Sequence, residues 1–129
     1  MDKRTVCDII NFQLNGQMKQ TELQTGERLS NTLRNRMNAR DVKVGCDAGD
    51  CGACTAAVGE LKKNKIEYKS INTCITFLYT LNGKQLVTIE HLGNLSLHPV
   101  QKAMVDSDGS QCGFCTPGIV MSMYCICLL

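Results

Sequence analysis

Four cysteines carry the clearest chemical signal in this chain. Three stand in the pattern C-x4-C-x2-C, and a fourth follows after nineteen further residues: Cys46, Cys51, Cys54 and Cys74. Cysteine thiolates are soft ligands that bind iron and zinc, and in a reducing compartment clustered cysteines are typical metal ligands. The spacing therefore predicts a metal centre in which one loop supplies three sulfur ligands and a remote part of the chain supplies the fourth.

The spacing also indicates which metal centre this is. C-x4-C-x2-C with one distant cysteine is typical of plant-type ferredoxins, whose four cysteines hold a 2Fe–2S cluster. A loop that wraps this core must bring its amide groups close to the sulfurs, in conformations that a Cβ obstructs. Gly45, Gly49 and Gly52 supply that freedom, so we predict that they form part of the cluster-binding loop. Amide hydrogen bonds to sulfur would also tune the reduction potential.

A structural role or a zinc site fits the cysteine spacing less well. Buried structural cysteines have no reason to adopt this spacing, and structural zinc usually draws on paired C-x2-C knuckles. A Rieske-type site needs two histidine ligands. The histidines are His91 and His98, and His98 precedes Pro99, where a helix-capping or surface role is expected. A zinc-binding interaction module remains the alternative from outside redox chemistry.

The composition limits the remaining function classes. The chain has 129 residues, 43% hydrophobic and 20% charged, which allows one small domain with a helical appendage. A net charge of +2 gives no reason to expect a nucleic-acid or anionic-membrane partner. Nine cysteines without a secretory signal argue against a disulfide framework. No apolar stretch approaches the roughly 18–20 residues of a membrane span, so we expect a cytoplasmic protein. No pattern for a catalytic residue is present, and no turnover is expected from this chain alone.

The first half of the chain is predicted to be rich in strands. Residues alternate between apolar and polar in Thr5–Gln13, and Asn15-Gly16 is a strong two-residue hairpin signal, which makes Gln17–Glu22 the returning strand. Charged residues 62–65 form a predicted turn between two later strands. These later strands are predicted at 54–58, 66–71 and 85–90.

One helix is predicted early among these strands. Thr25 is its expected N-cap, and Leu29, Leu33 and Met37 recur every four residues, so they should pack onto the sheet from one helix face. Residues 45–52 are predicted as loop. Strands interrupted by one early helix indicate an α+β fold with a β-grasp sheet, as in plant 2Fe–2S ferredoxins, rather than parallel βαβ units.

Later residues favour helices. Pro99 is expected in the first turn of one helix, and Thr116 followed by Pro117 predicts the N-cap and first residue of another. We therefore predict two domains. They are a 2Fe–2S ferredoxin-like β-grasp domain at 1–93 and a partial helical domain at 94–129.

Longer motifs around these cysteines resemble the molybdenum hydroxylases, the family of xanthine dehydrogenase and aldehyde oxidase. The run GCDAGDCGACT at 45–55 resembles the cluster loop of that family. Several other segments look most like the small subunit of bacterial xanthine dehydrogenase, namely NTCITFL at 72–78, GKQLVTIE at 83–90, LHPVQ at 97–101 and GSQCGFCTPG at 109–118. The resemblance runs from about Val6 to Tyr124.

This resemblance implies a second centre and a place in an electron-transfer chain. It implies that the helical domain holds a second 2Fe–2S cluster, with Cys112 and Cys115 as half of its ligands, and that Gln111 lies against a pterin as a hydrogen-bonding neighbour. Electrons would leave a molybdopterin centre and pass through both clusters toward FAD. The implied partners are a molybdopterin-binding large subunit and an FAD-binding domain or subunit. The alternative of a free-standing ferredoxin would call for an acidic docking surface, against which the net charge argues.

The C-terminal sequence departs from the family. Relatives continue into a further helix and then a C-x-C pair that completes the second cluster. Here Cys125-Ile126-Cys127 comes early, on a predicted helix where residues two apart point about 200° apart. Cys125 and Cys127 are therefore interpreted as ordinary helix residues, with substitution for the missing pair as the alternative. We expect a truncated or frameshifted reading frame, or a fragment. The substrate, whether purine, aldehyde or other, is not determined by these residues.

Overall fold

A β-hairpin begins the part of the chain that the structure describes, which in this computed structural model is residues 9–129. Strand β1 (Ile9–Leu14) pairs with β2 (Gln17–Glu22) in antiparallel register. Asn15 and Gly16 have φ values of 50° and 84°, as a tight turn with left-handed residues requires. The predicted hairpin is confirmed from Ile9 onward. Residues 5–8 of the predicted first strand, including Cys7, lie outside the described residues.

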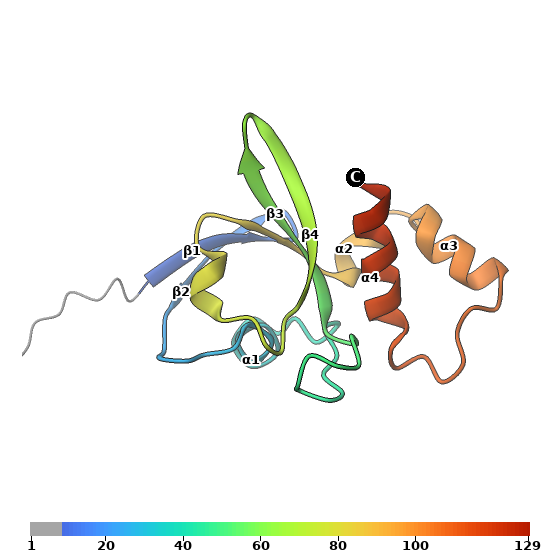
Figure 1. Ribbon diagram of the computed structural model, residues 1–129, viewed down its shortest axis with the longest axis horizontal. Helices are drawn as coiled ribbons and strands as arrows, with labels where there is room; N and C mark the ends of the chain where they lie inside the picture. Colours follow the sequence, from blue (N-terminus) through green and yellow to red (C-terminus); the bar gives the residue numbers. More distant parts are fainter. Residues whose placement is uncertain (1–8) are drawn as a thin grey trace, which may run out of the picture.

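Five strands form one mixed sheet in the order β2-β1-β5-β3-β4 (Figure 1). The others are β3 (Thr55–Lys62), β4 (Lys65–Asn72) and β5 (Gln85–Val87). Strand β1 runs parallel to β5, and every other pairing is antiparallel. This arrangement confirms the predicted α+β β-grasp fold. The last strand is shorter than predicted because Ile89–Leu92 forms a short helix, α2.

The early helix starts later than predicted. Helix α1 (Leu29–Asn31) continues directly as the π-helical segment η1 (Thr32–Arg36), and Thr25 lies in the turn before it. The predicted N-cap at Thr25 is wrong because Arg28 is held in an extended conformation by a β-bridge to the distant Phe77. A local capping pattern does not reveal a restraint that comes from forty-nine residues further along the chain.

The sheet is covered on both faces, with a core on each side. Neighbouring residues of a strand point to opposite faces. Accordingly, Ala56 and Leu86 belong to the core beneath α1, while Ala57 and Val87 belong to a second core. The first core also contains Phe12, Leu29, Leu33 and the short 3-10 helix η2 (Leu78–Leu81). The predicted packing of the early helix onto the sheet is thus confirmed.

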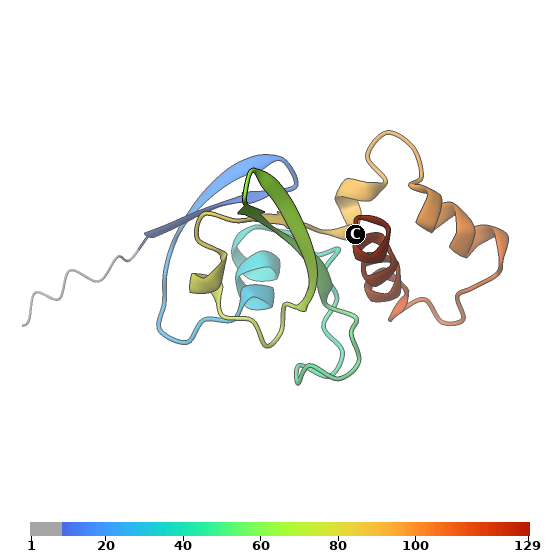
Figure 2. The ribbon, with the colours of Figure 1, turned by 45° about the horizontal axis from the view of Figure 1, so that its top comes forward.

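The second core is built by three helices, called here the helical unit. They are α2, α3 (Pro99–Asp106) and α4 (Thr116–Cys127), and Figure 2 shows them gathered at one end of the sheet. Val120 and Met121 of α4 are buried against Ala57 and Val87 of the sheet. The domain division at residues 93 and 94 stays a prediction, and α2 packs with the helices that follow it.

Helix α3 begins where the sequence predicts, whereas the N-cap of α4 lies one residue before the predicted one. His98 is the N-cap of α3: its Nδ1 accepts a hydrogen bond from the Val100 amide at 3.2 Å, and Pro99 opens the helix. The capping role expected for His98 is confirmed. The prediction of Thr116 as the N-cap of the next helix is wrong by one residue, because Cys115 holds that position. No helix within residues 9–129 is long and apolar enough to cross a bilayer.

Candidate metal centre

The loop at residues 45–54, called the cluster loop, curls tightly between η1 and β3. Asp47, Gly49 and Gly52 have φ values of 55°, 72° and 74°, in the left-handed region that favours glycine. Gly45 is required for another reason, since a Cβ there would lie 2.8 Å from the Cys51 sulfur. At Gly49 a Cβ would lie 2.7 Å from Ile75 Cδ1. The predicted glycines therefore stand where the backbone bends sharply or passes close to a sulfur.

Cys46 and Cys51, called the outer pair, are exposed to solvent and surrounded by backbone amides. The amides of Ala48, Asp50 and Cys51 donate to the Cys46 sulfur at 3.3, 3.2 and 3.2 Å. The Cys51 sulfur accepts from Cys46 at 3.4 Å and from Ala53 at 3.5 Å. These amide hydrogen bonds, led by that from Cys51, lower the pKa of Cys46 to about 7 because they favour the thiolate. The loop is thus shaped to hold negatively charged sulfur.

Cys54 and Cys74, called the inner pair, lie in the core of the β-grasp domain. Their exposed fractions are 2% and 1%, and the Cys74 amide donates to the Cys54 sulfur at 3.4 Å. Burial raises the pKa of Cys74 to about 11, a shift that the Gly49 amide opposes. Because iron and zinc bind the thiolate, metal binding must release the proton that Cys74 holds.

The two pairs act on each other electrostatically. Besides burial, the charges of Cys54 and of Cys46 both raise the pKa of Cys74. Two irons bridged by sulfides take four cysteine thiolates, two on each iron. Within residues 9–129 no group of three or more His, Cys, Asp or Glu side chains is arranged around one metal ion. The structure thus places the predicted ligands as an exposed pair in the cluster loop and a buried pair at Cys54 and Cys74.

A polar clamp, formed by residues to which the sequence analysis gave no role, ties the cluster loop to the sheet. The Asn72 side chain donates through Nδ2 to the Gly49 carbonyl at 3.2 Å. Its Oδ1 lies 3.3 Å from the Thr55 hydroxyl, which in turn donates to the Gly52 carbonyl at 2.7 Å. Asn72 and Thr55 are opposite each other on β4 and β3, so the sheet register sets this contact.

A second residue that the sequence pattern did not single out is Arg28. The Nη1 of Arg28 donates to the Cys74 carbonyl at 2.9 Å, and its guanidinium carbon lies 5.8 Å from the centre of the Phe77 ring. A positive charge is therefore fixed beside the remote ligand. The Arg28–Phe77 bridge that delays the helix start also brings this side chain to the centre.

The cysteines expected to bind a second cluster, Cys112 and Cys115, are exposed to solvent. Gln111, Cys112 and Cys115 are exposed in the segment between α3 and α4. Cys125 is buried among the residues of the second core, where desolvation raises its pKa, and Cys127 is exposed. Helix α4 is continuous from Thr116 to Cys127, so Cys125 lies about 15 Å along the axis from Cys115 at 1.5 Å per residue. This placement favours the interpretation of Cys125 as a core residue.

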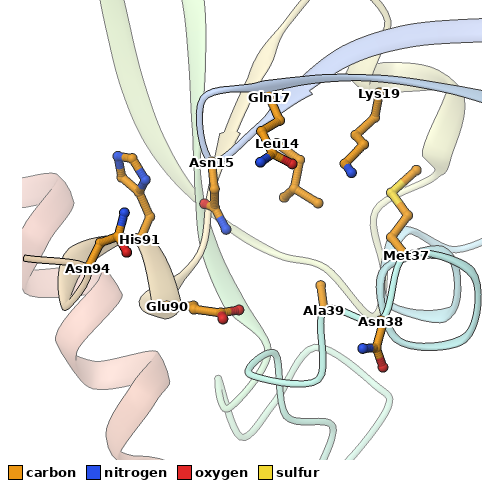
Figure 3. Close-up of a pocket in the computed structure, with 10 residues that line it drawn as sticks. All are labelled: Leu14, Asn15, Gln17, Lys19, Met37, Asn38, Ala39, Glu90, His91 and Asn94. Atoms are coloured by element: carbon orange, nitrogen blue, oxygen red, sulfur yellow. The ribbon is translucent and has the colours of Figure 1, made fainter.

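A polar hollow of about 270 Å³ lies elsewhere, between the β1–β2 hairpin and α2 (Figure 3). Figure 3 shows Lys19 and His91 on opposite sides of it, with Glu90 and Asn94 nearer to His91. None of the described cysteines lines this hollow. It is therefore separate from the thiols that could hold iron.

The β-grasp sheet and the glycine-rich loop with its four paired thiols define an iron–sulfur protein of the plant-ferredoxin class. Comparisons with known proteins agree. Residues 12–79 match the family described as 2Fe-2S iron-sulfur cluster binding domain, and residues 88–128 match the family described as 2Fe-2S binding domain. Xanthine dehydrogenase/oxidase of Mus musculus is 42% identical over 127 residues, which are 94% of this chain and 9% of the mouse protein.

Solved structures show the same likeness. Aldehyde oxidoreductase from Desulfovibrio gigas superposes with a TM-score of 0.78 and 34% identity, over 92% of this chain and 12% of that one. Quinoline 2-oxidoreductase from Pseudomonas putida 86 superposes with a TM-score of 0.79 and 25% identity, over 92% of this chain and 68% of that one. The chain belongs to the 2Fe–2S iron–sulfur cluster binding family, and within it to the iron–sulfur segments of the xanthine dehydrogenase family. It spans about a tenth of the length of the xanthine dehydrogenases that it matches.

Proposed function

We propose that this chain is the electron-transfer iron–sulfur module of a molybdenum hydroxylase of the xanthine dehydrogenase type. In this role it relays electrons from a molybdopterin centre toward FAD. The observation that supports the proposal is an exposed pair of thiols and a buried pair, three of the four in a loop whose amides donate to the Cys46 sulfur and the fourth at Cys74. A 2Fe–2S cluster, when bound there, supplies one-electron redox chemistry.

The residues of the chain have distinct tasks in this proposal. The outer pair, Cys46 and Cys51, and the inner pair, Cys54 and Cys74, supply the four thiolates. The amides of the cluster loop stabilise negative charge on sulfur, which favours the reduced form. The inner pair anchors the centre in the core, while the outer pair lies at the surface, where electrons can be exchanged with a neighbouring centre.

The second centre and the partners are also part of the proposal. Cys112 and Cys115 would supply two ligands of a second 2Fe–2S cluster, and Gln111 would contact the pterin. The helical unit and the segments beside it expose large apolar side chains, which in a lone chain would face water. These are Leu95, Leu97, Val105, Ile119, Ile126, Leu128 and Leu129. Their exposure supports contact with a molybdopterin-binding subunit and an FAD-binding domain.

Iron analysis with spectroscopy tests the proposal. After anaerobic reconstitution with iron and sulfide, the full chain is expected to hold two irons, to be red-brown, and to lose visible absorbance with dithionite while one rhombic EPR signal develops. Cys74→Ser should lower the iron content, the visible absorbance and the EPR signal. Cys127→Ser, which removes an exposed thiol at the far end of α4, should leave all three unchanged. Four irons per chain and two EPR signals would indicate that the second cluster also forms. A colourless chain that binds only zinc would overturn the proposal.

A further inference from the structure

Phe114, which stands between the second-cluster cysteines Cys112 and Cys115, lies close to Gly45 of the cluster loop. The residue is 51% exposed, so part of its ring faces solvent. A Cβ placed on Gly45 would lie 3.2 Å from Phe114 Cε1 and 2.8 Å from the Cys51 sulfur. The edge of the ring and an outer-pair sulfur therefore meet over the same glycine.

The start of α4 holds this ring in place. A Cβ on the buried Gly118 would overlap the Gly52 carbonyl oxygen, so only glycine lets the helix lie directly on the cluster loop. Figures 1 and 2 both show the first turn of α4 beside this green loop. Upstream, the Ser110 and Thr116 hydroxyls lie 2.7 Å apart and close the segment that carries Phe114. Gly118 of α4 and Phe114 of the segment before it thus both reach the cluster loop.

From these contacts we infer that Phe114 shields one side of the outer thiol pair, next to Cys51, and limits the access of water to that side. The inference rests on the proposed function, because it assumes a cluster held by Cys46, Cys51 and their inner partners. An apolar shell around a metal centre lowers the local dielectric and shifts its potential. Reduction adds negative charge, which water stabilises, so excluding water lowers the reduction potential.

The experiment compares Phe114→Ala with the unchanged full chain, both reconstituted with iron and sulfide. The variant is expected to keep two irons per chain, to show a less negative midpoint potential in a redox titration followed by visible absorbance, and to lose that absorbance several-fold faster in the presence of an iron chelator. Phe114→Leu, which keeps apolar bulk, should have a midpoint potential and a rate of absorbance loss between those of Phe114→Ala and the unchanged chain. Ile126→Ala removes an exposed apolar side chain at the other end of α4 and should match the unchanged chain.

Gly118→Ala tests the same inference from the backbone side. The added methyl group must push α4 away from Gly52, so the potential and the chelator rate should move in the direction seen for Phe114→Ala. If Phe114→Ala fails to hold iron, the midpoint potentials and chelator rates of Phe114→Leu and Gly118→Ala test the inference instead. Potentials and rates equal to those of the unchanged chain, with two irons retained, would overturn the role of Phe114 and leave the electron-relay proposal standing. An unchanged chain that binds no iron would overturn the proposed function itself.

Discussion

The four thiols of the first centre are chemically unequal, although they are the same residue type. Cys46 is exposed and surrounded by amide donors, which lower its pKa to about 7. Cys74 is buried, and desolvation raises its pKa to about 11. The difference arises from the position of each residue in the fold. The cluster loop surrounds the Cys46 sulfur with amide donors, whereas the core removes water from the Cys74 sulfur.

This difference predicts the order of alkylation in the iron-free chain. At pH 7 about half of Cys46 is thiolate, because the pH equals its pKa, whereas Cys74 remains protonated until the pH approaches 11. Only the thiolate reacts rapidly. Iodoacetamide at pH 7 should therefore modify Cys46 well before Cys74, as measured by peptide mass spectrometry over time. Equal rates, or earlier modification of Cys74, would contradict the prediction.

Arg28 is expected to tune the first centre through its charge. Its guanidinium donates to the Cys74 carbonyl, and a fixed positive charge there favours the more negative, reduced form. Arg28→Gln should therefore make the midpoint potential more negative, with iron content retained, in a redox titration. Lys65→Gln is the matched control because it removes an equal charge at the far end of the β3–β4 hairpin, roughly 25 Å from the cysteines at 3.3 Å per residue. A shift of equal size in both variants would show that only net charge matters.

At the scale of elements, local signals worked where the responsible contacts are local. Asn15-Gly16 marked its hairpin because a two-residue turn needs left-handed backbone at both positions. Pro99 marked the start of α3 because its fixed φ suits the first turn. The predicted start at Thr25 failed because a bridge to Phe77 controls Arg28, and the strand predicted to residue 90 was cut short by α2. The restraint on Arg28 comes from a residue far along the chain.

The hairpin turn gives a stability prediction at this scale. Gly16 has a φ of 84° with open space around it, so Gly16→Ala costs only the strain of a left-handed alanine, about 1 kcal/mol. Urea denaturation should show that loss in the free energy of unfolding. Gly93→Ala is the matched control because Gly93 has an ordinary φ of −98° and a Cβ there would make only ordinary contact with the Gln101 side chain, at 3.6 Å. A loss at Gly93 as large as that at Gly16 would show that the left-handed backbone is not the cause.

The whole molecule is organised by a sheet that carries a core on each face. Leu86 and Val87 are adjacent in β5 yet belong to different cores, so one short strand connects the ferredoxin-like part to the helical unit. On the second face, Gly118 lies against Gly52 of the cluster loop. Packing of the helical unit and the shape of the first centre are therefore physically linked.

Met121 provides a test of how strongly the helical unit packs on the sheet. Its side chain is fully buried in α4 against the sheet, so Met121→Ala should lower the free energy of unfolding by about 2–5 kcal/mol. The measurement is urea denaturation of the full chain, with Ile126→Ala, an exposed position on the same helix, as the control expected to change little. A loss at Met121 no larger than at Ile126 would mean that α4 contributes little to stability.

The sequence by itself determined the β-grasp class, the hairpins and the glycine-rich loop, because thiol spacing, turn residues and alternation act over short stretches of chain. Only the tertiary structure decided which residues surround that loop. Asn72 reaches Gly49 through strand register, Arg28 reaches Cys74 through a bridge to Phe77, and Phe114 reaches Gly45 through helix packing. Each of these contacts joins segments far apart in the chain, and their meeting depends on how the sheet is covered, which no local pattern encodes.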